Sequence, residues 1–210
     1  MIKILIADDH AYIREGLKQI LAETSDMVVA GEAADGREVL DRVRKDDYDL
    51  VLLDIAMPGR SGLDTLGQLK HEKPELPVLV LSIYPEEQYA IRAFKAGVSG
   101  YLTKESAPEE LISAIRKVTQ GGKYVSSSLA EKLAFNLETV TEKPPHEKLS
   151  DREYEVMIMI ASGKTVKEIA DKLSLSVKTI STNRVRALKK MGMKNNAEIT
   201  YYAIKQGLVP

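Results

Sequence analysis

The chain of 210 residues contains no cysteine. Disulfide bonds, thiolate zinc sites and cysteine nucleophiles are therefore excluded. No apolar run approaches the roughly 18–20 residues that a membrane-spanning helix needs, and the N-terminus enters strand-forming residues without a signal-peptide pattern. With 44% hydrophobic and 29% charged residues, the composition is that of an ordinary globular protein, which we expect in the cytoplasm without a membrane partner.

The net charge of −1 conceals an uneven distribution along the chain. Residues 1–146 hold more acidic than basic side chains, whereas residues 147–210 hold more basic ones. An acidic first part joined to a basic second part predicts two modules with different partners. A polyanion is a candidate partner of the second module.

Up to about residue 122, short apolar runs alternate with amphipathic stretches. This alternation predicts right-handed β-α-β crossovers and five parallel strands, hence a doubly wound α/β domain. In such folds the functional site lies beyond the carboxyl ends of the strands. The expected strands are residues 3–7, 27–31, 50–54, 78–82 and 100–104, and the expected helices are residues 11–21, 36–45, 62–71, 86–96 and 108–120.

After residue 122 the strand pattern does not recur. Capping pairs, a capping serine and C-terminal glycines predict further helices, which begin at Ser128, Ser150, Thr165 and Ser176 and end near Gly163, Gly192 and Gly207. The polar, proline-containing residues 141–148 are typical of a linker. We therefore predict a first domain over residues 1–122, a linker helix and linker over 123–148, and a small all-helical domain over 149–210.

Carboxylates directly follow two of the expected strands. Asp8 and Asp9 end the apolar run 4–7, and Asp54 ends the run 50–53. If both strands are central and parallel, the three carboxylates converge at one edge of the sheet. We expect hard oxygen ligands and no histidine or cysteine ligand at the strand ends, a set that suits Mg²⁺, or Mn²⁺ in its place. A lone aspartate after a strand is more often a turn former or helix N-cap, but the same feature at two strand ends favours a cation site.

The next two expected strands also end in polar side chains. Ser82 ends the fourth strand, and Tyr101 and Lys104 lie on the fifth. Taken singly, such a serine is more often a helix cap and such a lysine is solvated. Around a carboxylate cluster, a metal ion, an ammonium group and a hydroxyl group together form a site for one oxyanion such as phosphate.

The first domain is similar to the receiver domain of bacterial two-component response regulators, a flavodoxin-like fold. The resemblance rests on ADD at 7–9, LLDIAMPGRSG at 52–62, VLS at 80–82 and GYLTK at 100–104. It implies that Asp54 accepts a phosphoryl group from a sensor histidine kinase. The metal site that it implies is formed by Asp8, Asp9, Asp54 and the backbone carbonyl of Ala56.

The same resemblance assigns roles to the other strand-end residues. Lys104 would pair with the phosphoryl group, while Ser82 and Tyr101 would be the switch pair that registers it, with Tyr101 turning inward on phosphorylation. Glu105 departs from the family pattern, since many receivers have proline after the lysine.

Residues 177–191 have two distinct faces when drawn as a helix. An apolar stripe about 100° wide is expected to pack on the domain core and contains Val177, Ile180, Ala187, Leu188 and Met191. Cations and small side chains lie opposite or beside it: Lys178, Ser181, Thr182, Val185, Arg186 and Lys189. Cations suit phosphates, and small side chains can meet base edges. Arg184 falls within the stripe, so we expect it to pack or to contact phosphate. With the preceding helix and short turn, the pattern predicts a helix–turn–helix whose second helix enters the major groove.

Residues 149–209 resemble the LuxR-type helix–turn–helix, and the whole chain is similar to response regulators of the NarL/FixJ class. The resemblance rests on LSDREYEV at 149–156, IASGKTVKEIADKLSLSVKTIS at 160–181 and LKKMGMKNNAEI at 188–199. It implies a transcription factor that binds an inverted-repeat operator as a homodimer, with RNA polymerase as a further partner. The base-facing residues would be Lys178, Ser181, Thr182 and Val185.

Two other classes of protein share some of these features. A metal-dependent phosphohydrolase also uses an aspartate nucleophile, but such enzymes commonly carry a second acid two residues later, where this chain has Ala56. We therefore expect no enzyme, apart from weak dephosphorylation of its own Asp54. An interaction-only adaptor would bind protein through its helical domain. Salt-dependent binding to duplex DNA distinguishes the adaptor from a transcription factor.

Overall fold

The computed structural model describes residues 1–57, 61–126, 129–130 and 144–209. The chain divides into two compact units, Met1–Leu133 and Ala134–Pro210. The helix start expected at Ser128 and Glu131, and residues 141–143 of the expected linker, lie outside the described residues. None of the helices in the described ranges is long and apolar enough to cross a membrane.

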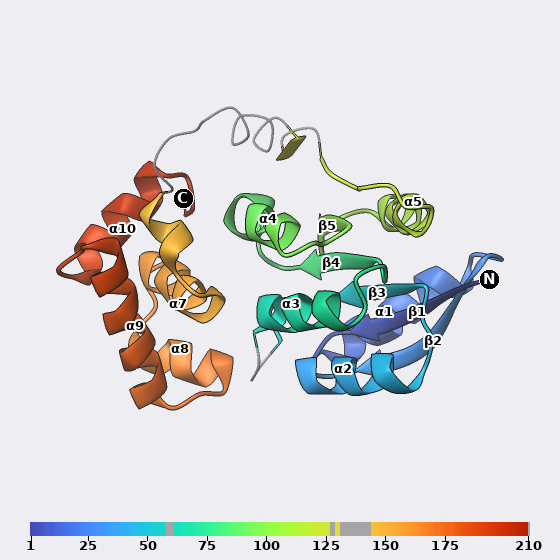
Figure 1. Cartoon of the computed structure of the whole chain (residues 1–210), viewed down its shortest axis with the longest axis horizontal. Coiled ribbons are helices and arrows are strands. Elements are labelled where there is room, and N and C mark those ends of the chain that lie inside the picture. Colours follow the sequence, from blue (N-terminus) through green and yellow to red (C-terminus); the bar gives the residue numbers. More distant parts are fainter. Residues whose placement is uncertain (58–60, 127–128, 131–143, 210) are drawn as a thin grey trace. The chain divides into compact units, whose positions relative to one another are not determined.

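The first unit is built on a five-stranded parallel sheet in the order β2-β1-β3-β4-β5. Helices alternate with the strands, which confirms the expected doubly wound α/β fold (Figure 1). The strands are β1 (Ile2–Ala7), β2 (Met27–Ala33), β3 (Leu50–Leu53), β4 (Val78–Ser82) and β5 (Gly100–Thr103), and the helices are α1 (Ala11–Ala22), α2 (Gly36–Lys45), α3 (Gly62–Glu72), α4 (Glu86–Lys95) and α5 (Pro108–Thr119).

Helices cover both faces of this sheet. Ile4 and Ile6 of β1 pack in one apolar cluster with Leu21 of α1 and Ile115 of α5. Helices α2, α3 and α4 pack beside one another on the other face. Because both faces are covered, β3 and β4 are buried along their whole length. Polar side chains of the central strands can therefore reach solvent only at the strand ends.

The carboxyl ends of β1 and β3 lie side by side. The two strands are hydrogen-bonded in a register that pairs Ala7 with Leu53, and the amide of Asp54 donates to the carbonyl of Ala7 at 2.8 Å. The chain leaves β1 toward β2 on one side and returns to β3 on the other, so this is the point where the strand order reverses. Ligand sites of doubly wound folds form at such a point.

The described part of the second unit is all-helical. Residues of the expected linker form the short 3-10 helix η1 (Pro145–Lys148), and four α-helices follow: α7 (Asp151–Ala161), α8 (Val166–Leu173), α9 (Val177–Met191) and α10 (Asn196–Lys205). The capping boxes expected at Ser150 and Thr165 are both present, and Ser176 caps α9. Gly192 ends α9 in the left-handed region at φ 69°, which a residue without a side chain adopts at little cost.

Candidate functional site

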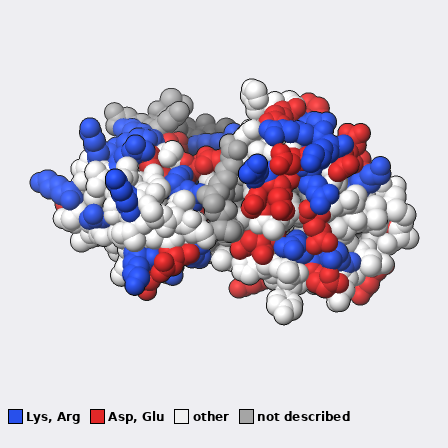
Figure 2. Space-filling model, turned by 90° about the horizontal axis from the view of Figure 1, so that it is seen from below, with Lys and Arg blue, Asp and Glu red and all other residues white. Residues whose placement is uncertain are grey.

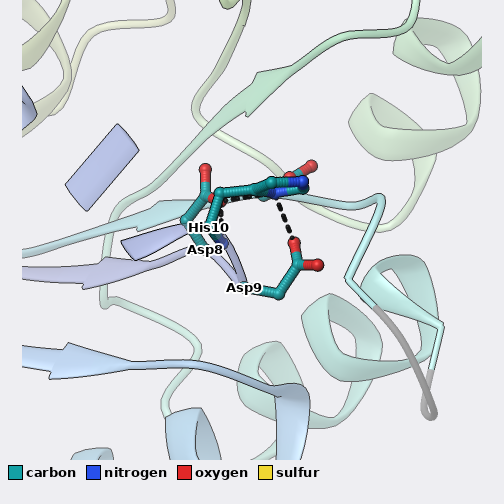
Figure 3. A group of neighbouring side chains, drawn as sticks. Asp8, Asp9 and His10 are labelled. Carbon is teal, nitrogen blue, oxygen red and sulfur yellow. Dashed lines mark hydrogen bonds and ion pairs between the residues drawn. The ribbon is translucent and has the colours of Figure 1, made fainter. Parts of the chain in front are cut away.

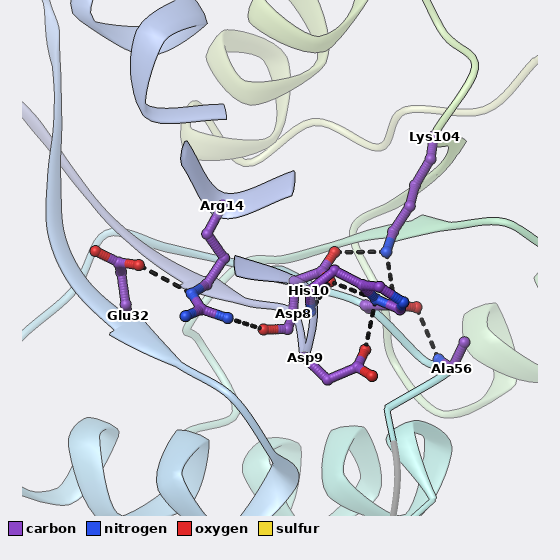
Figure 4. Close-up of polar contacts among 8 residues, drawn as sticks. Asp8, Asp9, His10, Arg14, Glu32, Ala56 and Lys104 are labelled. Atoms are coloured by element: carbon purple, nitrogen blue, oxygen red, sulfur yellow. Dashed lines mark hydrogen bonds and ion pairs between the residues drawn. The ribbon is translucent and has the colours of Figure 1, made fainter. Parts of the chain in front are cut away.

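Three carboxylates meet at the carboxyl edge between β1 and β3, and Figure 4 shows two of them, Asp8 and Asp9. Asp8 and Asp54 are each only 2% exposed, and Asp9 is half-buried. One ligand atom from each of Asp8, Asp9, Asp54 and the neighbouring His10 lies within 4.8 Å of all the others. The fold thus brings together the three carboxylates that the sequence places at strand ends.

Lys104 bridges two of these carboxylates from the end of β5. Its Nζ lies 2.5 Å from Asp8 Oδ2 and 2.6 Å from Asp54 Oδ2. Burial alone would lower the pKa of Lys104, but the Asp54 and Asp8 carboxylates outweigh this effect and raise it. The lysine is therefore charged, and it neutralises part of the negative charge of the cluster.

Asp54 is held by a hydrogen bond at each carboxylate oxygen. Its Oδ1 accepts from the amide of Ala56 at 2.7 Å, and its Oδ2 accepts from Lys104 at 2.6 Å. Burial raises the pKa of Asp54, while Lys104 and the Ala56 amide act in the opposite direction. Ala56 thus contacts the cluster through its amide, whereas the family resemblance implies a metal-binding role for its carbonyl. The result is a positioned carboxylate with little access to solvent.

The donor set fits a divalent cation such as Mg²⁺ or Mn²⁺. Among the described residues, the Lys104 ammonium group contacts two of the three clustered carboxylates, so the negative charge of the carboxylates exceeds the charge of this lysine. In the described part of the chain, Asp9 Oδ1 is a buried atom that accepts no hydrogen bond. Although His10 Nδ1 lies 3.0 Å from it, that contact lacks hydrogen-bond geometry. A hard cation held by Asp8, Asp9 and Asp54 would satisfy this oxygen and balance the charge.

His10 belongs to this cluster, so the expectation of no histidine at the strand ends is wrong. Its Nδ1 lies 3.3 Å from Asp8 Oδ1 and 3.0 Å from Asp9 Oδ1 (Figure 3). The backbone amide of His10 donates to Asp8 Oδ1 at 2.8 Å, and this local turn brings the ring back over the strand end. The signal in the sequence is adjacency, because His10 directly follows the two aspartates.

Arg14 supports the same turn from α1, and nothing in the sequence pattern marks it. Its Nη1 donates to the backbone carbonyl of Asp8 at 2.7 Å, and its Nε donates to Glu32 Oε2 at 2.9 Å. Lys18 donates to the other oxygen of Glu32 at 3.0 Å. Hydrogen bonds from Lys18 and Arg14 lower the pKa of Glu32. The backbone that carries Asp8 is therefore tied to β2 through a charged side-chain network.

The expected switch residues Ser82 and Tyr101 are both fully buried. The Ser82 hydroxyl accepts from the amide of Tyr84 at 3.2 Å, and the Tyr101 hydroxyl donates to the carbonyl of Tyr84 at 2.8 Å. Burial raises the pKa of Tyr101. The Tyr101 ring already points inward in this structure. The inward turn expected on phosphorylation would therefore have to begin from a different conformation. The burial of the ring and its hydrogen bond to Tyr84 both favour this position.

Helix α9 presents most of the side chains expected to contact DNA. Lys178, Thr182, Val185, Arg186 and Lys189 are exposed, and Ser181 is half-buried. Val185 is 57% exposed, although its side chain is apolar. The Thr182 hydroxyl donates to the carbonyl of Lys178 at 2.9 Å, which leaves its oxygen free to accept a further hydrogen bond. The exposed face combines cations with small side chains, as the helical wheel predicts.

One residue assigned to the packing stripe of α9 is placed differently. Val177 is 52% exposed, whereas Ile180, Ala187, Leu188 and Met191 are buried. Val177 is the first residue of the helix, at the end of the stripe. Arg184 donates to Asn196 Oδ1 at 2.6 Å and so ties α9 to the start of α10, in agreement with a packing role.

Charge is distributed differently over the two units. On the face drawn in Figure 2, Lys and Arg side chains predominate on the helical unit. Asp and Glu side chains gather on the sheet-containing unit, interspersed with basic ones. This matches the uneven distribution of charge along the sequence.

Both units match known protein families. Residues 4–116 match the response regulator receiver domain, and residues 147–203 match the bacterial regulatory proteins of the luxR family. The response regulator GacA of Pseudomonas aeruginosa is 36% identical over 210 residues, covering 100% of this chain and 98% of that protein. The response regulator UvrY of Escherichia coli is 35% identical over 209 residues, covering 99% of this chain and 96% of that protein.

Solved structures of similar proteins include RcsB of Salmonella typhimurium, with a TM-score of 0.70, 28% identity and 98% of each chain covered. RcsB of Salmonella enterica serovar Typhimurium bound to the promoter rprA in the presence of the phosphomimetic BeF3- matches with a TM-score of 0.66 and 28% identity, covering 96% of this chain and 97% of that one. The chain therefore belongs to the two-component response regulators of the NarL/FixJ class, transcription regulators in which a receiver domain precedes a LuxR-type DNA-binding domain.

Proposed function

We propose that Asp54 accepts a phosphoryl group from a sensor histidine kinase and that this phosphorylation controls operator binding by α9. The observation that carries the proposal is the position of the buried Asp54 carboxylate, 2.6 Å from the Lys104 ammonium group and clustered with Asp8 and Asp9. Phosphoryl transfer depends mainly on positioning and on neutralising charge, and this cluster provides both.

The transfer needs few protein groups. An Asp54 oxygen attacks the phosphorus atom of a phosphohistidine, and a new O–P bond forms while the N–P bond breaks. The electron pair of the broken bond remains on the imidazole nitrogen of the kinase, which takes up a proton. A divalent cation held by Asp8, Asp9, Asp54 and the Ala56 carbonyl would supply further neutralisation of the phosphoryl oxygens.

Lys104 and Ser82 are positioned to follow the new charge. The phosphoryl group adds about −1.5 to −2 charge, and Lys104 already contacts the oxygen of Asp54 that points toward it. The Lys104 ammonium group has three N–H donors and contacts two carboxylates, so its third donor can bind a phosphoryl oxygen. A shift of the Ser82 hydroxyl toward the phosphoryl group would remove its hydrogen bond with the Tyr84 amide, and so alter the loop that leads into α4.

The phosphoacceptor is tested by replacing Asp54 with its amide. We expect Asp54→Asn to abolish acid-labile phosphorylation of the intact protein by acetyl phosphate in Mg²⁺, measured by mass spectrometry, because the amide is a poor nucleophile. EDTA should abolish phosphorylation of the wild type. Asp47→Asn is the matched control, since the Asp47 side chain is 97% exposed. A wild-type phosphoryl group found on another residue would disprove the assignment.

The same cluster supports weak self-dephosphorylation rather than turnover of a separate substrate. Hydrolysis of the aspartyl phosphate requires a water molecule aligned with the O–P bond. Ala56, two residues after Asp54, has no group that could accept a proton from that water. We therefore expect the phosphorylated protein to lose its phosphoryl group slowly.

We further propose that α9 reads duplex DNA in the major groove. The exposed Thr182 and Val185 side chains can meet base edges, while Lys189 can meet a phosphate. The similarity to RcsB, which was solved bound to promoter DNA, supports this assignment. An inverted-repeat operator would suit a homodimer of the chain, and RNA polymerase would be a further partner at the promoter.

The reading role of α9 is tested by comparing two kinds of variant. Lys189→Ala should weaken binding equally across DNA sequences and reduce the salt dependence by about one counterion, because it removes a phosphate contact. Thr182→Ala and Val185→Ala should change the preferred sequence at one base pair by about 1–3 kcal/mol. Selection from a randomised DNA pool followed by salt titration measures both effects. If all three variants lose affinity uniformly, α9 does not read bases.

A further inference from the structure

His10 directs a ring nitrogen toward the carboxylate oxygens of the acidic cluster. Its Nδ1 lies 3.0 Å from Asp9 Oδ1 and 3.3 Å from Asp8 Oδ1 (Figure 3). Two ligands at right angles around a metal ion, each at a bond length near 2.1 Å, are about 3.0 Å apart. The nitrogen and the two oxygens therefore have the mutual spacing of neighbouring ligands of one cation.

The ring is held in this position by the local backbone. The amide of His10 donates to Asp8 Oδ1 at 2.8 Å, and His10 immediately precedes α1, whose first turn fixes the direction of the chain. The His10 side chain is 64% exposed, whereas that of Asp8 is 3% exposed. His10 therefore lies on the open side of the cluster, where a cation from solution would enter.

His10 Nδ1 makes a hydrogen bond with Asp8 Oδ1 at 3.3 Å, but this bond does not account for the shorter contact of the ring with Asp9. The approach of Nδ1 to Asp9 lacks hydrogen-bond geometry, and within the described residues Asp9 Oδ1 has no hydrogen-bond partner. A cation between the ring and the carboxylates would satisfy Asp9 Oδ1 and would replace the hydrogen bond of Nδ1 with Asp8, using the lone pair of Nδ1 in the tautomer that carries its proton on Nε2. The four side chains together offer one nitrogen and three oxygen ligands.

We propose that His10 Nδ1 is a ligand of the divalent cation, and that this nitrogen makes the site favour Mn²⁺ and later first-row divalent ions over Mg²⁺. Mg²⁺ prefers oxygen ligands, whereas imidazole suits transition metals, whose affinities for a given site rise along the first row from Mn²⁺ to Cu²⁺. The inference rests on the proposed function, because it takes the acidic cluster to be the metal site.

The test measures metal binding directly, on the untagged full-length chain without phosphodonor. Calorimetric titration with Mn²⁺ and with Mg²⁺ gives the ratio of the two affinities for wild type, His10→Asn and His71→Asn. His71 is an exposed residue of α3 and serves as the matched control. We expect the ratio to fall about tenfold or more in His10→Asn and to be unchanged in His71→Asn. Pulsed electron paramagnetic resonance of bound Mn²⁺ should show coupling to an imidazole nitrogen in wild type and His71→Asn, and none in His10→Asn.

The outcomes separate this inference from the proposed function. Equal affinity ratios in all three proteins, with no nitrogen coupling in wild type, would overturn the role of His10. If Asp54→Asn also weakened Mn²⁺ binding in that case, the acidic cluster would remain the metal site and only the His10 inference would fail. If Asp54→Asn bound Mn²⁺ as tightly as wild type, the metal site itself would be wrong, and both proposals would fail.

Discussion

Tyr84 is held at its amide by Ser82 and at its carbonyl by Tyr101. Both of these side chains are fully buried, so a change at either one reaches the start of the β4–α4 loop without passing through solvent. A phosphoryl group shifts the side chains of Ser82 and Tyr101 only if it interacts more favourably with one conformation of the two side chains than with another. The inward position of the Tyr101 ring is one of these conformations.

The stability of the inward position can be measured at Tyr101. Tyr101→Phe removes the hydrogen bond to Tyr84 and should destabilise the first unit by about 1 kcal/mol. Tyr101→Ala also removes a buried ring and should cost about 3–5 kcal/mol. Hydrogen exchange followed by mass spectrometry on β5 peptides reports these losses for the first unit separately. Tyr12→Phe, at a residue that is 94% exposed, should change exchange very little. Equal exchange in Tyr101→Phe and wild type would show that the hydrogen bond does not hold the ring.

At the scale of elements, the sequence predicts those ends of helices and strands that neighbouring residues determine. It does not predict the ends that contacts between distant segments determine. The apolar run of β3 and the capping boxes at Ser150 and Thr165 depend on neighbouring residues, and the structure has them where they are expected. β2 continues to Ala33. The expected end at residue 31 is too early because Glu32 is polar and interrupts the apolar pattern. Glu32 lies there because Arg14 and Lys18 of α1 bind it, a pairing that no local pattern shows.

The same distinction applies to the candidate site. Asp8, Asp9, Asp54 and Lys104 can be predicted because strand ends in a parallel sheet converge. The contribution of His10 depends on the path of the chain after β1, which residue types alone do not determine. Val177 lies on the apolar side of the helical wheel, yet at the first position of α9 it is 52% exposed. Periodicity therefore assigns a face to each residue, but it does not show how far the packing extends along that face.

Helices α2 and α3 are joined by a two-point ion pair. Arg44 donates through Nε to Glu72 Oε2 at 2.8 Å and through Nη2 to Glu72 Oε1 at 2.6 Å. Hydrogen bonds from Arg44 and from Gln68 lower the pKa of Glu72 to about 2. Because this pKa is lower in the folded state than the ordinary value of 4.5, the charged form of Glu72 stabilises the fold above about pH 4.5, and this contribution is lost as the pH falls toward 2.

Glu72→Gln should therefore be less stable than wild type at pH 7, with a difference that narrows as the pH falls below 4.5. The measurement is the thermal midpoint of the first unit by calorimetry from pH 7 to pH 3. The effect should be small and should weaken in high salt, since the pair is at the surface. Glu75→Gln, at an exposed residue shortly after α3, is the control and should not reproduce the pH dependence. A difference that is constant from pH 7 to pH 3 would contradict the role of the Glu72 charge.

At the scale of the whole molecule, an acidic receiver unit is joined to a basic helical unit. The basic unit alone offers one recognition helix, and a single helix–turn–helix makes too few contacts for tight binding to an operator. Two copies can instead contact half-sites about one helical turn apart on an inverted repeat. Control by phosphorylation then requires that the receiver unit change either the pairing of two chains or the access of α9 to DNA.

We expect phosphorylation of Asp54 to promote dimerisation or to release the DNA-binding unit, and thereby to raise affinity for an inverted-repeat site. The physical reason is that the new negative charge draws Lys104 and Ser82, and Ser82 and Tyr101 both contact Tyr84 ahead of α4. Analytical ultracentrifugation and DNA titration, each with and without phosphodonor, measure the two effects. Asp54→Asn is the control and should not respond to the phosphodonor. If wild type with verified phosphorylation of Asp54 shows the same oligomeric state and the same operator affinity as the unphosphorylated protein, the receiver does not control DNA binding in this way.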